Sequence, residues 1–176
     1  MAHRFSAFAV PAEHIKYLQQ HPGAVFHYLE GREPESIDPS SLPAGWPTER
    51  LKSLGAWGIN HRNVDLYHWI LNGGPTLVTG SGSIFQTWYQ PDRHSAIKLD
   101  MLNERFAFSP EQIQELTALV AQVTVQSVVK AFAAWSKSQG NNHELDEEEC
   151  EPFVEEFDMF GTGLNEALNK GYGLIW

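Results

Sequence analysis

The stretch NHRNVDLYHWILNGG, residues 60–74, contains the pattern that decides the fold. Asn60 suits a helix N-cap, because its side chain can accept a hydrogen bond from an unpaired amide of the first turn. Asn72, Gly73 and Gly74 favour the left-handed conformation at which helices end. Between these ends apolar side chains occur on every side, and a helix that is apolar all round is normally buried. We therefore predict a buried central helix with the other elements packed around it.

Three polar residues of the same stretch share one face of this helix. His61, Asp65 and His68 are spaced at i, i+4 and i+7, so their side chains project in one direction. Two imidazoles and a carboxylate are suitable ligands for a divalent metal, and an Asp beside a His can orient a general base. The simpler interpretation is structural, because His68 lies between Tyr67 and Trp69 and suits a hydrogen-bonded core histidine.

Length and composition indicate one domain over residues 1–176. The chain has 42% hydrophobic residues, which is enough for a substantial core, and it has no apolar run of membrane-spanning length. The N-terminus shows no signal-peptide pattern. Cys150 is the only cysteine, which excludes an internal disulfide bond and suits a reducing cytosol. Its acidic neighbours are expected to raise the pKa of the thiol, so we expect no cysteine nucleophile and a cytoplasmic location.

The negative charge gathers at one end of the chain. The net charge is −10, and residues 141–176 carry 10 Asp and Glu residues against the single Lys170. Nucleic-acid binding needs clustered Lys and Arg, so this distribution argues against it. The same distribution favours a basic partner or simple solubility.

Strand and helix patterns alternate along the first hundred residues. Alternating or β-branched apolar residues predict strands over residues 4–10, 76–79, 84–90 and 97–102. Helical spacing predicts a short helix after Pro11 and a second one, with Val25, Phe26 and Leu29 on its apolar side, that ends at Gly31. Residues 31–50 contain four prolines and no periodicity, so they form a long loop. The loop is either a surface connection or a functional lid or partner loop, and Trp46 is a candidate anchor for it.

The C-terminal half reads as three helices. Ser109 and Gln112 form a capping box around Pro110, which begins the first of them. Thr124 caps the second helix, which ends near Gly140. Five apolar residues at helical spacing define the last helix: Phe153, Phe157, Phe160, Leu164 and Leu168. Glycines at 161 and 163 weaken its middle, and residues 174–176 are predicted to close as an edge strand. The fold class is α+β: helix-rich, with a small, mostly antiparallel sheet around the buried central helix.

The acidic segment between Glu144 and Asp158 holds nine carboxylates and no Lys or Arg. One interpretation is a solvated helix start, where acids interact favourably with the positive end of the helix dipole. The order of acids does not match a calcium-binding loop. The other interpretation is a docking face for a basic protein. Under it the partner-binding residues are Asp146, Glu147, Glu148, Glu149, Glu155 and Glu156, and the side chains of Glu155, Glu156 and Asp158 face outward.

Several segments resemble the YfbM-like family, a group of small bacterial proteins with a domain of unknown function. Residues 8–15 with His21-Pro22 resemble its opening strand, helix and turn, and residues 65–73 resemble its central helix. Residues 109–113 resemble the start of its long helix, and residues 157–171 resemble its closing helix. This chain departs from the family at Arg62, Asn63 and Val64, where the family often has a Lys and a Trp. The resemblance implies a single α+β domain and supplies no activity or catalytic residues.

The sequence contains no complete catalytic constellation. The leading hypothesis is therefore a non-enzymatic, cytosolic protein-binding protein, most concretely an acidic inhibitor or immunity protein that neutralises a basic toxin or enzyme, with no cofactor, nucleic acid or membrane involved. The alternative is a small-molecule or metal-dependent enzyme or binder that uses His61, Asp65 and His68. A third possibility, a structural subunit or homo-oligomer, depends only on the abundance of aromatic residues.

Overall fold

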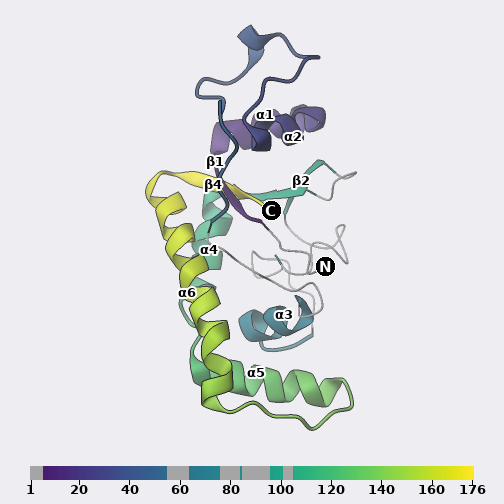
Figure 1. Cartoon of the computed structure of the whole chain (residues 1–176), viewed down its shortest axis with the longest axis vertical. Coiled ribbons are helices and arrows are strands. Elements are labelled where there is room, and N and C mark those ends of the chain that lie inside the picture. Colours follow the sequence, from purple (N-terminus) through teal and green to yellow (C-terminus); the bar gives the residue numbers. More distant parts are fainter. Residues whose placement is uncertain (1–5, 55–63, 76–83, 85–95, 101–104) are drawn as a thin grey trace.

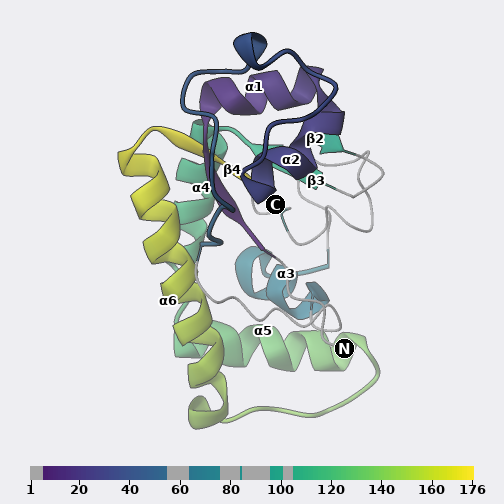
Figure 2. The ribbon, with the colours of Figure 1, turned by 45° about the horizontal axis from the view of Figure 1, so that its top comes forward.

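The chain has an α+β fold. The structure, a computed structural model, describes residues 6–54, 64–75, 84, 96–100 and 105–176. Within these ranges helices flank a four-stranded sheet (Figures 1 and 2). The elements are, in chain order, β1 (Phe8–Pro11), α1 (Ala12–Gln20), η1 (Pro22–Ala24), α2 (Val25–Glu30), η2 (Pro39–Ser41), α3 (Val64–Asn72), β2 (Ile97–Asp100), β3 (Arg105–Phe108), α4 (Pro110–Val120), α5 (Val125–Ser138), α6 (Glu147–Asn169) and β4 (Tyr172–Ile175).

The sheet is antiparallel throughout, in the order β1-β4-β3-β2. Ile175 of β4 pairs with Phe8 of β1 on one side and with Ala107 of β3 on the other. Just beyond β4, Trp176 and Phe106 exchange two backbone hydrogen bonds, of 2.8 and 3.1 Å. The strand predicted at residues 174–176 therefore exists, but its predicted position at the edge is wrong, because it is an interior strand.

Helices cover both faces of the sheet. Ile175 faces a cluster formed with α1 and α2, which includes the buried Leu18. Leu174 faces the larger cluster formed with α3, α4, α5 and α6, and so do Phe106 and Phe108. These two phenylalanines are 1% and 0% exposed, and burying each one stabilises the fold by about 1.5–3 kcal/mol. Because both faces of β3 and β4 are covered, neither strand shows the alternation of apolar and polar residues that marks a half-exposed strand. For this reason β3 was not predicted from the sequence.

Four of the predicted helix ends are present where the sequence placed them. Ser109 and Gln112 form the capping box of α4, and Thr124 with Ser127 forms that of α5. Each box satisfies amides that have no partner inside the helix. Gly73 adopts a left-handed conformation (φ 71°) just after α3, and Gly31 does so (φ 66°) after α2.

The predicted weak point at residues 161–163 does not break α6, which is continuous over 23 residues. A Cβ at Gly161 would lie 3.2 Å from Val120 Cγ1, and one at Gly163 would lie 3.0 Å from Leu54 Cβ. These two glycines therefore serve close packing against α4 and against the segment that follows the long loop. A second correction concerns Phe26, which was predicted on the apolar side of α2 and is 57% exposed.

The long loop after Gly31 is packed onto α1 and α2. The Trp46 ring lies 4.9 Å from the Tyr28 ring, and its indole N–H donates to the Arg32 carbonyl at 2.9 Å. Buried His14 adds a second attachment, because its Nε2–H donates to the Ala44 carbonyl at 2.9 Å. Its Nδ1 then accepts the Tyr28 hydroxyl at 2.8 Å. The loop is thus attached to the body at several points, with Trp46 as the predicted anchor.

The central helix α3 is buried, as the sequence predicts. Its side chains from Val64 to Leu71 are buried except for exposed Asp65 and half-buried Trp69, and it packs mainly on α5 (Figure 2). The proposed cap Asn60 lies outside the described residues. So do the strands predicted over residues 76–79 and 84–90, apart from buried Ile84.

No single helix within the described ranges is long and apolar enough to cross a membrane. Helices α4 and α5 reach the required length and apolarity only together, and they meet at a bend of 92°.

Candidate functional site

The first half of α6 presents a row of carboxylates to solvent. Glu147, Glu151, Glu155 and Asp158 recur at intervals of three or four residues, so they lie along one side of the helix. All four are exposed, and they span about 16 Å of helix. We term these four residues the acidic ridge. Glu151 and Asp158 were not among the predicted partner-binding residues, although their spacing from Glu147 and Glu155 would have identified them.

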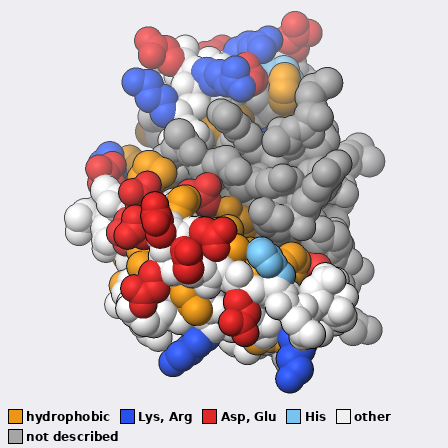
Figure 3. Space-filling model, turned by 60° about the horizontal axis from the view of Figure 1, so that its bottom comes forward, with side chains coloured by type: hydrophobic (Ala, Val, Ile, Leu, Met, Phe, Trp, Pro, Cys, Tyr) orange, Lys and Arg blue, Asp and Glu red, His pale blue; other side chains and the backbone are white. Residues whose placement is uncertain are grey.

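The acidic ridge lacks cationic neighbours among the described residues. The ion pairs found between described residues lie elsewhere, where Glu30 of α2 pairs with Arg32 and Arg50 of the long loop. Figure 3 shows the acidic side chains gathered on one face, with Lys and Arg only at its margins. Like charges four residues apart on a helix cost about 0.2–0.5 kcal/mol per pair. The ridge therefore lowers the stability of α6, so the requirements of folding do not explain why these four carboxylates are there.

Two of the predicted partner-binding residues cap α6. The Asp146 carboxylate accepts the Glu149 amide at 2.9 Å, and the Glu149 carboxylate accepts the Asp146 amide at 3.1 Å. Their charges also favour the positive end of the helix dipole. Burial raises the pKa of the Cys150 thiol, and the charges of Asp146 and Glu149 raise it further. The expected direction of this pKa is confirmed, and burial is its first cause.

A third predicted residue, Glu156, is not fully outward-facing. It is half-buried, and its carboxylate accepts the Tyr67 hydroxyl at 2.5 Å. Burial raises the pKa of Tyr67 and so does the bond to Glu156, because both disfavour the phenolate. Glu156 thus ties α6 to α3. The expectation that Glu155, Glu156 and Asp158 all face solvent is confirmed for Glu155 and Asp158 and is wrong for Glu156.

The alternative site on α3 is only partly described. His61 lies outside the described residues, while exposed Asp65 and buried His68 both line a pocket of about 160 Å³ beside the end of α5. The Asn72 side-chain amide donates to His68 Nδ1 at 3.0 Å and to the His68 carbonyl at 3.1 Å. The second bond fixes the amide orientation, because a carbonyl can only accept.

The proton of neutral His68 therefore lies on Nε2, and its Nδ1 lone pair is occupied. Ligation of a metal through either nitrogen requires a different arrangement of Asn72. Within the described part of the chain, no group of three His, Cys, Asp or Glu residues is placed to hold a metal ion. The hydrogen bonds from Asn72 therefore favour the interpretation of His68 as a structural core histidine.

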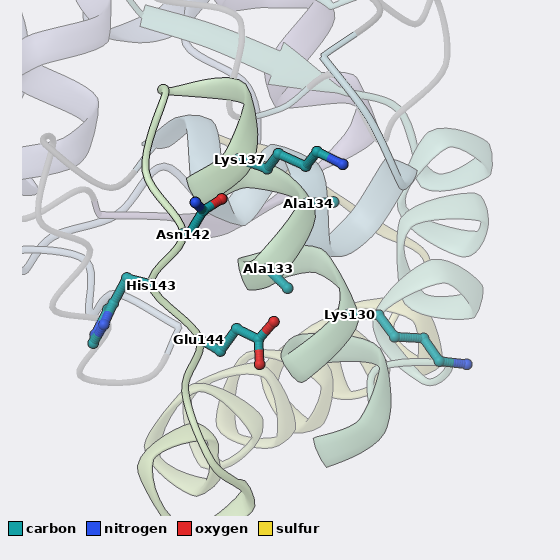
Figure 4. A pocket seen from close by; sticks show the side chains of 7 residues that line it. All are labelled: Lys130, Ala133, Ala134, Lys137, Asn142, His143 and Glu144. Atoms are coloured by element: carbon teal, nitrogen blue, oxygen red, sulfur yellow. The ribbon is translucent and has the colours of Figure 1, made fainter.

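A larger pocket of about 380 Å³ lies between α5 and the segment that joins it to α6. Figure 4 shows Glu144 pointing toward α5, whereas Lys130, Lys137 and His143 point away from the space. Binding sites for small molecules bring a few polar groups together at one place. This pocket does not, and Ala133 and Ala134 are among the residues that line it.

Searches for relatives gave no further identification. Comparisons with protein-family models, with curated proteins and with solved structures found no match.

Proposed function

We propose that the chain is a non-enzymatic, cytosolic protein-binding protein that uses the first half of α6 to bind a basic protein, as an inhibitor or immunity protein does. The observation that carries this proposal is the acidic ridge: four exposed carboxylates in one row, with no described Lys or Arg in ion-pair distance. Membership of the YfbM-like family remains a prediction.

An exposed apolar side chain adjoins the ridge. Met159 is 47% exposed and follows Glu155 by one helical turn. Interfaces are enriched in methionine at their centres and surrounded by polar rims. Carboxylates around a methionine therefore fit a surface that attracts a basic partner over distance and contacts it closely.

The predicted residues divide into two roles under this proposal. Exposed Glu147, Glu148 and Glu155 face the partner, together with Glu151 and Asp158. The remaining three, Asp146, Glu149 and Glu156, hold the surface in shape through the capping box and the bond to Tyr67.

Charge reversal on the ridge tests the proposal. The double variant Glu151→Lys with Glu155→Lys is expected to slow association with the basic partner by about 10- to 100-fold at low salt, because electrostatic steering is reversed. The partner is obtained by capture from a lysate at low salt, release at high salt and mass spectrometry. Association rates are then measured by surface plasmon resonance at several salt concentrations.

The matched control is Glu33→Lys with Glu35→Lys. This variant makes the same change in net charge at two exposed positions of the long loop. It is expected to keep the association rate within about twofold, since charges beyond a Debye length are screened. An equal loss in both variants would show that net charge, and not the ridge, governs binding. Capture of no basic protein would remove the proposal.

The single variant Glu151→Lys is expected to stabilise the fold while it weakens binding. It replaces two like-charge pairs, with Glu147 and Glu155, by two opposite-charge pairs at i, i+4. The expected gain in the free energy of unfolding is about 0.5–1.5 kcal/mol at low salt and less at high salt. Urea unfolding followed by circular dichroism measures it. A loss of stability would mean that Glu151 already has a favourable partner.

A further inference from the structure

A groove between α4 and α6 lies at the C-terminal end of the acidic ridge. Its volume is about 250 Å³, which is below the roughly 300–1,000 Å³ of pockets that enclose whole ligands. Asp158, Thr162 and Asn165 line it from α6. Thr117 lines it from α4, and Ala121 lines it from the position just after α4. Its size suits one side chain of a partner.

The polar groups of this groove are mainly acceptors. The Thr162 hydroxyl donates to the Asp158 carbonyl at 3.0 Å, and the Thr117 hydroxyl donates to the Ile113 carbonyl at 2.7 Å. A hydroxyl has one proton, so both oxygens keep only lone pairs for a ligand. The Asn165 amide donates to the Gly161 carbonyl at 3.0 Å, which leaves its own carbonyl oxygen and one N–H.

The Asp158 carboxylate adds a negative charge to these acceptors. It is exposed, and none of the described residues forms a hydrogen bond or ion pair with its side chain. Two of the residues that line the groove are small, because Gly161 has no side chain and Ala121 has only a methyl group, which leaves room for a ligand. A negatively charged groove with many acceptors and one free N–H fits a cation that carries several donors.

We infer that this groove holds an arginine side chain of the basic partner. A guanidinium is planar, always charged and carries five N–H donors and no acceptor, so it complements oxygens on two facing helices better than an ammonium does. The inference rests on the proposed function. It adds Thr162 and Thr117 to the surface and assigns them, together with Asp158 of the ridge, the selection of arginine. The ridge attracts the partner, and the groove fixes the position along α6 at which the partner binds.

The probe for this site is N-acetyl-arginine amide, titrated into the ¹⁵N-labelled full chain at low salt. Saturable shifts of the Gly161, Thr162 and Ala121 amide signals are expected at millimolar concentration. The citrulline analogue, which is neutral and nearly isosteric, is expected to give none. Equal shifts with both compounds, or shifts spread evenly along α6, would overturn the inference.

Three variants sharpen the test. Asp158→Asn is expected to weaken the probe about fivefold, the range expected for a partly exposed charge pair. Asn165→Asp adds a second carboxylate to the groove and is expected to strengthen binding severalfold. Glu166→Gln removes a charge from the same helix at a residue that does not line the groove and is expected to change affinity less than twofold. A Glu166→Gln effect equal to that of Asp158→Asn would overturn the inference.

Failure of this inference is distinguishable from failure of the proposed function. If the captured basic protein loses affinity with the Glu151→Lys, Glu155→Lys variant but not with Asp158→Asn, the arginine site is refuted and the proposed function stands. If the arginine probe binds and no basic protein is captured, the groove takes a small cationic molecule, and both the partner and its anchor are refuted.

Discussion

Gly173→Ala is expected to lower the free energy of unfolding by about 3 kcal/mol, one of the largest effects of any single methyl group in this chain. A Cβ at this position would lie 2.4 Å from Ile15 Cδ1 and 2.5 Å from the Phe108 carbonyl oxygen. The isoleucine end can move, but the carbonyl belongs to the neighbouring strand. The sheet must therefore separate, or α1 must lift from its face.

Urea unfolding followed by tryptophan fluorescence measures this loss, and a fall in Tm of roughly 6–12 °C should accompany it. Gly23→Ala is the matched control. A Cβ there meets nothing within 4 Å, and its backbone is not left-handed, so its stability is expected to be unchanged or slightly higher. A loss below about 1 kcal/mol in Gly173→Ala would show that β4 can shift relative to α1.

Two tyrosines are expected to make the protein sensitive to alkali. Burial raises the pKa of Tyr28, and the charges of Tyr172 and Glu13 raise it further. Burial also raises the pKa of Tyr67, and the hydrogen bond to Glu156 adds to this shift. In the unfolded chain both hydroxyls ionise near pH 10. Above that pH the folded state holds protons that the unfolded state has released, so stability falls as pH rises.

Each tyrosine contributes a slope of up to about 1.4 kcal/mol per pH unit, or roughly 2–3 kcal/mol between pH 10 and 11 for the pair. Below pH 10 their contribution is fully present. Urea unfolding at pH 8, 10 and 11 measures the slope, and absorbance at about 295 nm reports phenolate formation. Tyr67→Phe is expected to halve the slope. Ordinary titration of all 5 tyrosines in the folded protein, with no loss of stability, would contradict this prediction.

The local features of the fold could be predicted because neighbours in sequence determine them. The capping boxes at Ser109 and Thr124 and the left-handed ends at Gly31 and Gly73 involve residues at most a few positions apart. The interior place of β4 could not be predicted in this way. It depends on pairing with β1, which lies more than 150 residues earlier, and its two buried faces remove the alternation that marks a strand.

The candidate site shows the same division. Counting charges was enough to find the acidic segment, but not to assign its members. Glu156 contacts Tyr67 across 89 positions of sequence, and Asp158 lines one groove with Thr117 and Ala121 only because α4 packs against α6. The capping roles of Asp146 and Glu149 were within reach of the sequence, because an acid followed three residues later by Glu is a capping-box pattern.

The strand order also governs how the chain can acquire its structure during synthesis. Of the twelve elements in the described residues, β1 emerges from the ribosome first, yet β4, its only partner among the described strands, emerges last. Until then β1 and β3 expose unpaired edges and apolar side chains, a state that is prone to association with other chains. Completion of the sheet therefore waits until β4 has been synthesised, and a chaperone that covers β1 until then is expected to raise the yield of folded protein.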